Sequence, residues 1–342
     1  MTEHLFAQKQ KNRKAPLTFS RLCLGWLGLF CLILMLRNSA VATEYIARGL
    51  RLCAKTIVPT LFPFMAISEL ALSSGVGAAM LRPLATLCRP VFRLSEQGCC
   101  AVFMGMLCGF PIGARCATAA LKDNRLTNNE ALRVLLFSTN PSTAFLINTV
   151  GVSLWGIRRV GVALCIVTLI SQLVVGLLFT HVFLPKEQHA DFSVHVQAEK
   201  NENSIGISKL FTQAIGSACS SILLVCAYVV FFSALSGVLH LTLNRLSAPT
   251  ILQAIIACFL ELSGGVSIAC GLSSVSLGMA LCAFAAGWCG VSVHCQLLSI
   301  CDGHDLMFRY YFLAKLLQGL LCALLILAWT AIDPSLLIIA KG

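Results

Sequence analysis

Charged residues are scarce in this 342-residue chain: they make up 11% of it, whereas hydrophobic residues make up 58%. A soluble domain would carry about 25% charged residues. The mean hydropathy of +0.85 agrees with that shortage. The composition excludes an ordinary soluble protein and predicts an all-α polytopic membrane protein, because helices satisfy their own backbone hydrogen bonds in lipid.

Several motifs of common enzymes and pumps are also missing. The sequence contains no G-x4-GK[ST] phosphate loop, no HExxH and no G-x-S-x-G. ATP-driven transport and the usual membrane-hydrolase chemistry therefore lack support. We expect no enzymatic activity and no cofactor.

Neither the cysteines nor the basic residues form a recognisable pattern of their own. The 18 cysteines are scattered through apolar runs, where cysteine behaves as a small hydrophobe, and they suggest no secreted disulfide framework. The net charge is +11, but the basic residues lie at the ends of apolar segments, as topology determinants do. Membrane lipids are therefore the expected partners and nucleic acid is not. No oligomeric state follows from the sequence.

The hydrophobicity pattern divides the chain into five parts. We predict a basic cytoplasmic tail (1–19), a first membrane half (20–185), a hydrophilic linker (186–209), a second membrane half (210–332) and a short tail (333–342). The apolar run 22–36 is expected to be a retained span rather than a cleaved signal peptide. Residues 44–55 predict either an interfacial amphipathic helix or the wet start of the next span.

The stretch 103–117 combines apolar sequence with helix-breaking residues. It places Gly105, Gly109 and Gly113 at four-residue intervals, with Pro111 between the last two. The proline predicts a break just before it, and the glycines allow another backbone to approach closely. Two interpretations follow: a Pro-kinked packing helix, or a re-entrant hairpin whose freed backbone faces protein or a water-filled cavity.

A second stretch resembles the first. Residues 108–116 (CGFPIGARC) have a counterpart in 289–296 (CGVSVHCQ), and polar loops follow at 122–125 and 302–305. An interrupted hydrophobic segment at corresponding positions of two halves points to a transporter-like central site. The first loop region is basic and the second acidic, so the two loops are predicted on opposite sides of the membrane. We therefore expect two inverted Gate-like repeats, the first covering 44–157.

Two carboxylates are flanked by apolar sequence. Glu69 and Glu261 are costly to ionise in hydrocarbon, so each is expected to face a cavity, pair with a cation or be protonated. Ser263 and Gly264 follow Glu261, as at a re-entrant tip. The alternative for either carboxylate is a helix-end glutamate at the level of the lipid headgroups.

Polar residues around the helix breaks complete the candidate site. Asn140 and Ser142 flank a proline and could hydrogen-bond where the helix breaks, or they could simply join helices. The candidate substrate-binding residues are Glu69, Gly109, Pro111, Gly113, Asn140, Ser142, Glu261, Ser263, Gly264, Ser292, His294 and Gln296.

A metal site is a weaker possibility. Cys289, His294, Cys295, Cys301 and His304 cluster in the sequence. Their spacings match no standard zinc pattern, so we assign no metal ligands.

Several sequence blocks resemble the sporulation integral membrane proteins of the YlbJ type. These blocks are 59–64 (PTLFPF), 68–70 (SEL), 89–93 (RPVFR), 104–114 (MGMLCGFPIGA) and 138–142 (STNPS). The similarity extends over roughly residues 20–332, and GFPIGA is its most specific part. That family is similar to the nucleoside-recognition, or Gate, domain group, which includes membrane portions of nucleoside transporters, ferrous iron transporters and spore maturation proteins.

The resemblance implies a role in endospore formation, in making the spore cortex, at the cell membrane of a Gram-positive spore former. We expect a secondary transporter or permease for a small molecule or ion, with Glu69, Asn140 and Glu261 lining its cavity. A non-transporting membrane scaffold for cortex assembly is the alternative. A metal-ion permease that uses the cysteine and histidine cluster is the third possibility.

Overall fold

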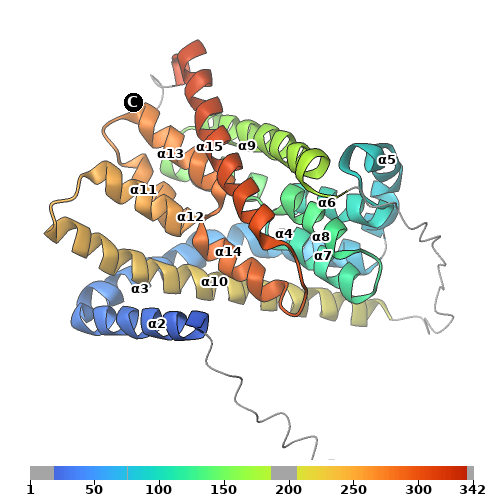
Figure 1. Cartoon of the computed structure of the whole chain (residues 1–342), viewed down its shortest axis with the longest axis horizontal. Coiled ribbons are helices and arrows are strands. Elements are labelled where there is room, and N and C mark those ends of the chain that lie inside the picture. The colour runs from blue at the N-terminus through green and yellow to red at the C-terminus, as the bar shows by residue number, and fades with distance from the viewer. Residues whose placement is uncertain (1–18, 75, 186–205, 337–342) are drawn as a thin grey trace, which may run out of the picture.

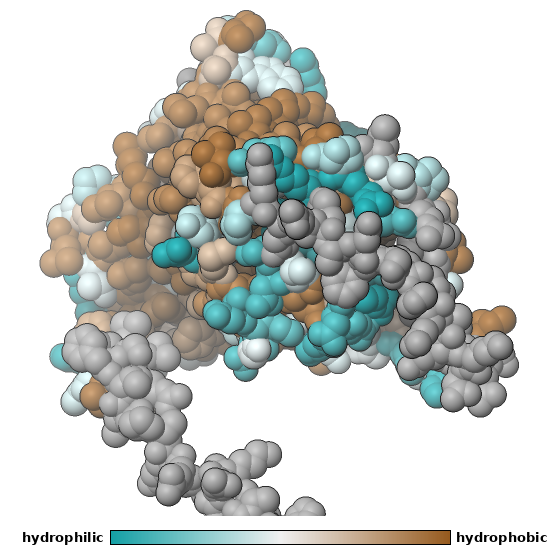
Figure 2. Space-filling view, turned by 45° about the vertical axis from the view of Figure 1, so that its right-hand side comes forward, coloured by the Kyte–Doolittle hydropathy of each residue, from teal (hydrophilic) through white to brown (hydrophobic). Residues whose placement is uncertain are grey.

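The computed structural model describes residues 19–74, 76–185 and 206–336 (Figure 1). Every regular element within these ranges is helical. Five helical runs in the described part are long and apolar enough to cross a membrane: Ser39–Ala71, Arg158–Phe183, Ile207–Arg245, Val275–Ile300 and Phe308–Ile332. Apolar side chains cover much of the visible surface (Figure 2). The predicted all-α polytopic membrane protein is confirmed.

The first half contains most of the shorter helices. Its elements are α2 (Phe19–Arg37), α3 (Ser39–Leu52), η1 (Cys53–Ile57), α4 (Val58–Ser73), α5 (Val76–Phe92), α6 (Glu96–Cys108), α7 (Ile112–Lys122), α8 (Asn128–Ser138), η2 (Phe145–Leu154), α9 (Arg158–Leu178) and η3 (Phe179–Phe183). The run α3–η1–α4 has no interruption, so residues 44–55 are the polar start of a span. The expected first span, 22–36, lies within α2.

The second half has fewer and longer elements. They are α10 (Ile207–Arg245), α11 (Thr250–Leu260), α12 (Leu262–Cys270), α13 (Val275–Trp288), α14 (Gly290–Ile300) and α15 (Phe308–Ile332). The predicted tail 1–19 and linker 186–209 lie mostly outside the described residues. Residues 207–209 already form the first turn of α10, so the helix begins before the predicted end of the linker.

The segment α6–α7 is a helical hairpin. Gly105 and Gly113 are eight residues apart, which in a continuous helix would separate them by about 12 Å. Instead, a Cβ atom placed on Gly113 would lie 3.0 Å from the Cα of Gly105. The chain therefore folds back at its tip, and the break predicted just before Pro111 is confirmed. These glycines provide the close approach at which the two helices pack.

The segment α11–α12 folds back in the same way. A Cβ atom placed on Gly265 would lie 2.4 Å from the Cα of Cys258, seven residues earlier in the chain. Glu261 lies at the tip and is the residue between the two helices. The tip predicted from the residues after Glu261 is thus present.

One order of elements occurs twice along the chain. Apart from α2 and α5, which have no counterpart in the second half, a long helical run, a hairpin, an interrupted helix and a final long helix occur as α3–α4, α6–α7, α8–η2 and α9, and again as α10, α11–α12, α13–α14 and α15. In this order the Pro111 tip corresponds to the Glu261 tip. The sequence comparison had paired the Pro111 segment with 289–296, which lies in an interrupted helix, so the structure corrects that pairing.

The structure also corrects the predicted placement of two loops. Thr118 Oγ1 of α7 lies 3.7 Å from Cys301 Sγ at the end of α14. Leu126 and Leu306, from the two following loops, belong to one apolar cluster. The loops 122–125 and 302–305 therefore lie at the same end of the molecule. The prediction had counted acidic residues, which contribute little to membrane topology.

The opposite end of the molecule is marked by Trp155. A Cβ atom placed on Gly278, at the start of α13, would lie 3.2 Å from the Trp155 ring. Arg159 at the start of α9 pairs with Asp333 after α15, with 3.8 Å between Nη2 and Oδ2. Below, the "Trp155 end" is the end with these residues, and the "Cys301 end" is the end with Thr118 and Cys301.

Candidate functional site

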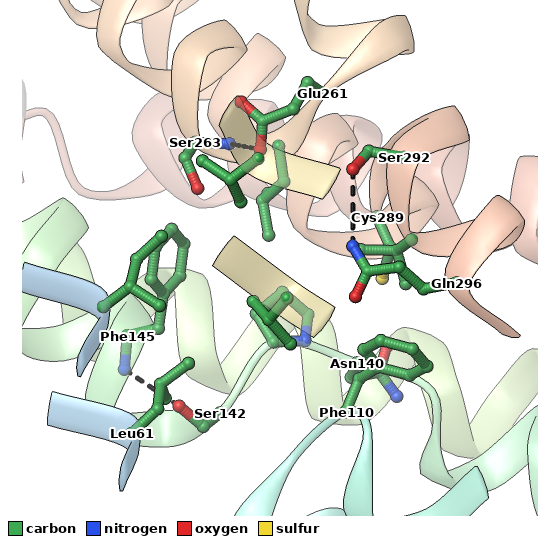
Figure 3. Close-up of a pocket in the computed structure, with 16 residues that line it drawn as sticks. Leu61, Phe110, Asn140, Ser142, Phe145, Glu261, Ser263, Cys289, Ser292 and Gln296 are labelled. Carbon is green, nitrogen blue, oxygen red and sulfur yellow. Dashed lines mark hydrogen bonds between the residues drawn. The ribbon is translucent and has the colours of Figure 1, made fainter. Parts of the chain in front are cut away.

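Four helix interruptions, namely the two hairpin tips and the breaks within α8–η2 and α13–α14, converge on one cavity of about 70 Å³ (Figure 3). Its polar lining residues are Asn140, Ser142, Glu261, Ser263, Ser292 and Gln296, and apolar side chains from η1, α4 and α10 close it. Figure 3 shows Glu261 and Ser263 of the second half across the cavity from Ser142 of the first. Sequence reasoning named all six of these polar residues.

The tip of the first hairpin docks on the interruption between α8 and η2. The amide of Phe110 donates to the carbonyl of Asn140 over 2.8 Å. Gly109 has φ of +76°, and a Cβ atom placed on it would lie 2.6 Å from the amide nitrogen of Ser142. Only glycine fits this backbone and this contact. Ser142 Oγ in turn accepts from the Phe145 amide over 3.2 Å and caps the following segment.

The tip of the second hairpin docks on the other interruption. Gly290 has φ of +84°, and a Cβ atom placed on it would lie 3.0 Å from the Leu262 amide nitrogen. Cys289, just before it, is also left-handed with φ of +71° and ends α13. Each hairpin tip therefore packs against the interrupted helix that follows it in the chain.

Glu261 caps the helix that begins at the second tip. Its carboxylate oxygens accept from the amides of Ser263 over 2.8 Å and Gly264 over 2.6 Å. The residue is 4% exposed and lines the cavity. It is therefore a buried carboxylate at the tip and not a helix-end glutamate at the membrane surface.

Lys315 and Gln318 of α15 are the polar residues that sequence reasoning missed. Lys315 Nζ donates to the Thr139 carbonyl over 2.6 Å, to Asn140 Oδ1 over 3.1 Å and to Gln318 Oε1 over 2.8 Å. Gln318 Nε2 donates to the same Asn140 oxygen over 2.7 Å. A lone lysine inside an apolar span, with a glutamine one turn later, was the available signal.

Asn140 connects this buried group to the cavity. It lines the cavity and is 5% exposed, and its Oδ1 accepts from both α15 side chains. Its Nδ2 has no hydrogen-bond partner among the described residues. Two buried donors are therefore left for water or a solute.

Several predicted site residues have other positions. Glu69 does not line the cavity: its Oε1 lies 3.6 Å from Nε of Arg115 on α7. His294 is packed among aromatic rings, with Nδ1 3.2 Å from the Tyr311 hydroxyl and the Trp288 ring centroid 4.3 Å away. The remaining residues that do not line the cavity shape the hairpin tips: Gly109, Pro111, Gly113 and Gly264.

The cysteines and histidines of the second half do not assemble into a metal centre. The described part of the chain holds no group of three or more His, Cys, Asp or Glu side chains placed to bind a metal ion. Cys289 lies at the helix interruption, where its Sγ donates to the Thr139 carbonyl over 3.5 Å. The metal-permease alternative therefore has no geometric support.

Comparison with known proteins identifies a relative. The chain is 24% identical over 336 residues to the sporulation integral membrane protein YlbJ of Bacillus subtilis (strain 168), covering 87% of this chain and 80% of the relative. The chain is similar to this sporulation integral membrane protein over most of its length. The similarity confirms the resemblance found in the sequence, and the five apolar runs agree with a multi-pass membrane location. No family model and no solved structure matches the chain.

Proposed function

We propose that this protein is a secondary transporter or permease for a small solute, required during endospore formation and, within it, for making the cortex. The observation that carries the proposal is the convergence of two hairpin tips and two helix breaks on one cavity. Interrupted helices in membranes expose polar backbone groups, and they are characteristic of transporter binding sites near mid-membrane. The sporulation role rests on the relative, which is itself a sporulation integral membrane protein.

An inverted-repeat arrangement supports a transporter. The interrupted helix α8–η2 starts in the loop after α7, at the Cys301 end, and finishes next to Trp155. The interrupted helix α13–α14 starts beside Trp155 and finishes at Cys301. These opposite directions support an inverted repeat, an arrangement that many secondary transporters have.

The long runs α3–α4 and α10 also point in opposite directions. Tyr45 near the start of α3 packs against Gly237 near the end of α10. Arg115, which pairs with Glu69 near the end of α4, donates over 2.6 Å to Ser217 near the start of α10. The runs α3–α4 and α10 are therefore antiparallel, as inverted repeats require.

The size of the cavity favours a small solute. One water needs about 10–15 Å³ of such space, so the cavity of about 70 Å³ holds a handful of waters or a small ion. Its polar groups are uncharged side chains and a carboxylate engaged by its own helix. A hydrogen-bonding solute suits this lining better than a bulky apolar one.

Uptake by the purified protein in liposomes tests the proposal. The panel includes nucleosides, cortex precursors, small organic acids and ferrous iron. We expect uptake of one solute class that Gln296→Leu lowers at least tenfold, because this side chain lines the cavity. Asn148→Leu is the matched control, since Asn148 is exposed on η2. Uptake no faster than in protein-free liposomes across the panel, with Gln296→Leu cells still sporulating normally, would favour a scaffold.

A further inference from the structure

The Lys315 ammonium occupies an oxygen cage behind the cavity. Its side chain is 0% exposed, and its three N–H groups meet three neutral oxygens: the Thr139 carbonyl, Asn140 Oδ1 and Gln318 Oε1. An ammonium has three donors, so none remains unused. Backbone-carbonyl and side-chain amide oxygens are also ligands that coordinate hard monovalent or divalent cations.

The cage lies where helix dipoles favour positive charge. Thr139 is the residue after α8, so its carbonyl is at the carboxyl end of that helix. Cys289 follows α13 and donates to the same carbonyl, which brings the carboxyl end of α13 close as well. Helix carboxyl ends carry partial negative charge and stabilise cations. The site is therefore built for a cation without using an acidic side chain.

No described carboxylate lies within ion-pair distance of Lys315 Nζ. The titratable side chains that face it are the Cys289 thiol, the His294 imidazole on α14 and the Cys322 thiol on α15 itself. The helices α13, α9 and α8 pack against α15, and α13 carries no Asp, Glu, Lys, Arg or His. On α8, Glu130 accepts from the amides of Ser95 and Thr127, and Arg133 donates to the carbonyls of Arg93 and Pro185. Arg159 of α9 points to the other end of that helix and pairs with Asp333. The charge of Lys315 is thus compensated by oxygens and helix ends alone.

We propose that Lys315 is a built-in cation: its ammonium fills a site that would otherwise bind a free monovalent ion, and its proton is the coupling ion of transport. The second clause rests on the proposed function, whereas the first does not. When water reaches the site, the ammonium gives one proton to a water molecule, its nitrogen keeps the electron pair of the broken N–H bond, and a neutral amine remains; taking up a proton restores the ammonium. Because Asn140 contacts both Nζ and the cavity, the charge on Lys315 changes the hydrogen bonding offered to a solute.

Vacating the cage tests the cation site without knowledge of a substrate. In detergent, the unfolding midpoint of Lys315→Ala is measured in choline chloride and, at equal ionic strength, in sodium, potassium or methylammonium chloride. We expect at least one small cation to raise the variant's midpoint by about 2 °C or more, because ligands that bind the folded state stabilise it. The wild-type midpoint should not respond, since its site is filled.

A variant that does not respond, or that responds no more than the wild type, overturns the cation site. Lys315→Ser, whose short side chain also leaves the cage vacant, is the second variant and should respond in the same way. If neither variant folds in choline chloride but one folds in methylammonium chloride, the site is supported. Failure to fold in every salt overturns it, because an empty cage that accepts ions would fold with them.

Transport in sodium-free liposomes tests the coupling. A pH gradient should drive solute uptake by the wild type, and Lys315→Ala should lose at least tenfold of that gradient-driven rate. Wild-type uptake that requires sodium would overturn the proton-coupling clause and leave the cation site and the permease intact. If cations raise the unfolding midpoint of the variant but the wild type takes up no solute, the cation site is supported and the permease is contradicted.

Discussion

Asn140 illustrates how much a single residue contributes at this site. Its Oδ1 accepts from Lys315 and Gln318, its backbone carbonyl accepts from the hairpin tip, and its side chain borders the cavity. Structural and functional roles therefore coincide in one side chain. Substitutions near it have to separate the two roles by measuring stability as well as uptake.

Asn140→Leu should destabilise the protein by about 1–3 kcal/mol, because two buried donors on α15 lose their shared acceptor. Thermal or denaturant unfolding in detergent measures this change. The control Asn148→Leu concerns an exposed residue of η2 and should change the unfolding free energy by less than about 0.5 kcal/mol. Equal effects of the two substitutions would show that the Lys315–Gln318 network contributes little.

Gly109→Ala should cost about 2–4 kcal/mol, since a Cβ atom there meets the Ser142 amide and the backbone is left-handed. Gly216→Ala is the matched control: Gly216 lies within α10, and a Cβ atom there meets nothing within 4 Å. That control should stabilise the helix by about 0.5–1 kcal/mol. A lower unfolding midpoint for Gly109→Ala and a higher one for Gly216→Ala would confirm the docking of the first tip. An unchanged midpoint for Gly109→Ala would contradict it.

At the scale of elements, the two hairpins and the two interrupted helices work as pairs. Each tip packs against the interruption that follows it, through Gly109 on Ser142 and through Gly290 on Leu262. At the first pair, the Phe110 amide freed at the tip donates to the Asn140 carbonyl of the interrupted helix. Helix breaks inside a membrane protein are tolerated where such backbone groups face protein.

Glu261→Ala should destabilise α12 by about 1–3 kcal/mol, because two buried amides lose their acceptors. Glu261→Gln retains one oxygen and should cost roughly half as much. Ser274→Ala is the control, since this cap of α13 is exposed, its bond is 3.4 Å long and water can replace it. Unfolding free energies that are the same for Glu261→Ala and Ser274→Ala would argue against the capping role.

At the scale of the whole molecule, apolar runs cross from one end to the other while each hairpin returns to the end it came from. Arg93 near the Cys301 end donates to the Thr180 carbonyl at the far end of the run Arg158–Phe183. That run of 26 residues spans about 39 Å. The two ends are therefore separated by a full membrane thickness.

Single cysteines introduced at Arg125 and Asp302 should react with a membrane-impermeant maleimide from the same side of the membrane. A cysteine at Arg159 should react from the other side. All three residues are exposed, and 17 of the 18 native cysteines are buried or half-buried, which keeps background labelling low. Labelling of sealed cells and of inverted vesicles measures this. Labelling of Arg125 and Asp302 from opposite sides would contradict the arrangement.

Much of the architecture was predictable because its causes are local. Apolar composition requires a membrane, proline and glycine require a break before Pro111, and polar residues after Glu261 require a tip. These features depend on backbone sterics and on solvation within a few residues. The same local signals named the six polar residues that line the cavity, together with six residues that do not line it.

Other features depended on contacts between distant segments, and only the tertiary structure decided them. It placed Glu69 against Arg115, brought the loops near Thr118 and Cys301 to one end, and matched the Pro111 tip with the Glu261 tip. It also joined Lys315 to Asn140, 175 residues away in the chain. The sequence by itself determined where the helices stop, because that follows from each residue and its neighbours. Which ends meet follows from packing across the whole molecule.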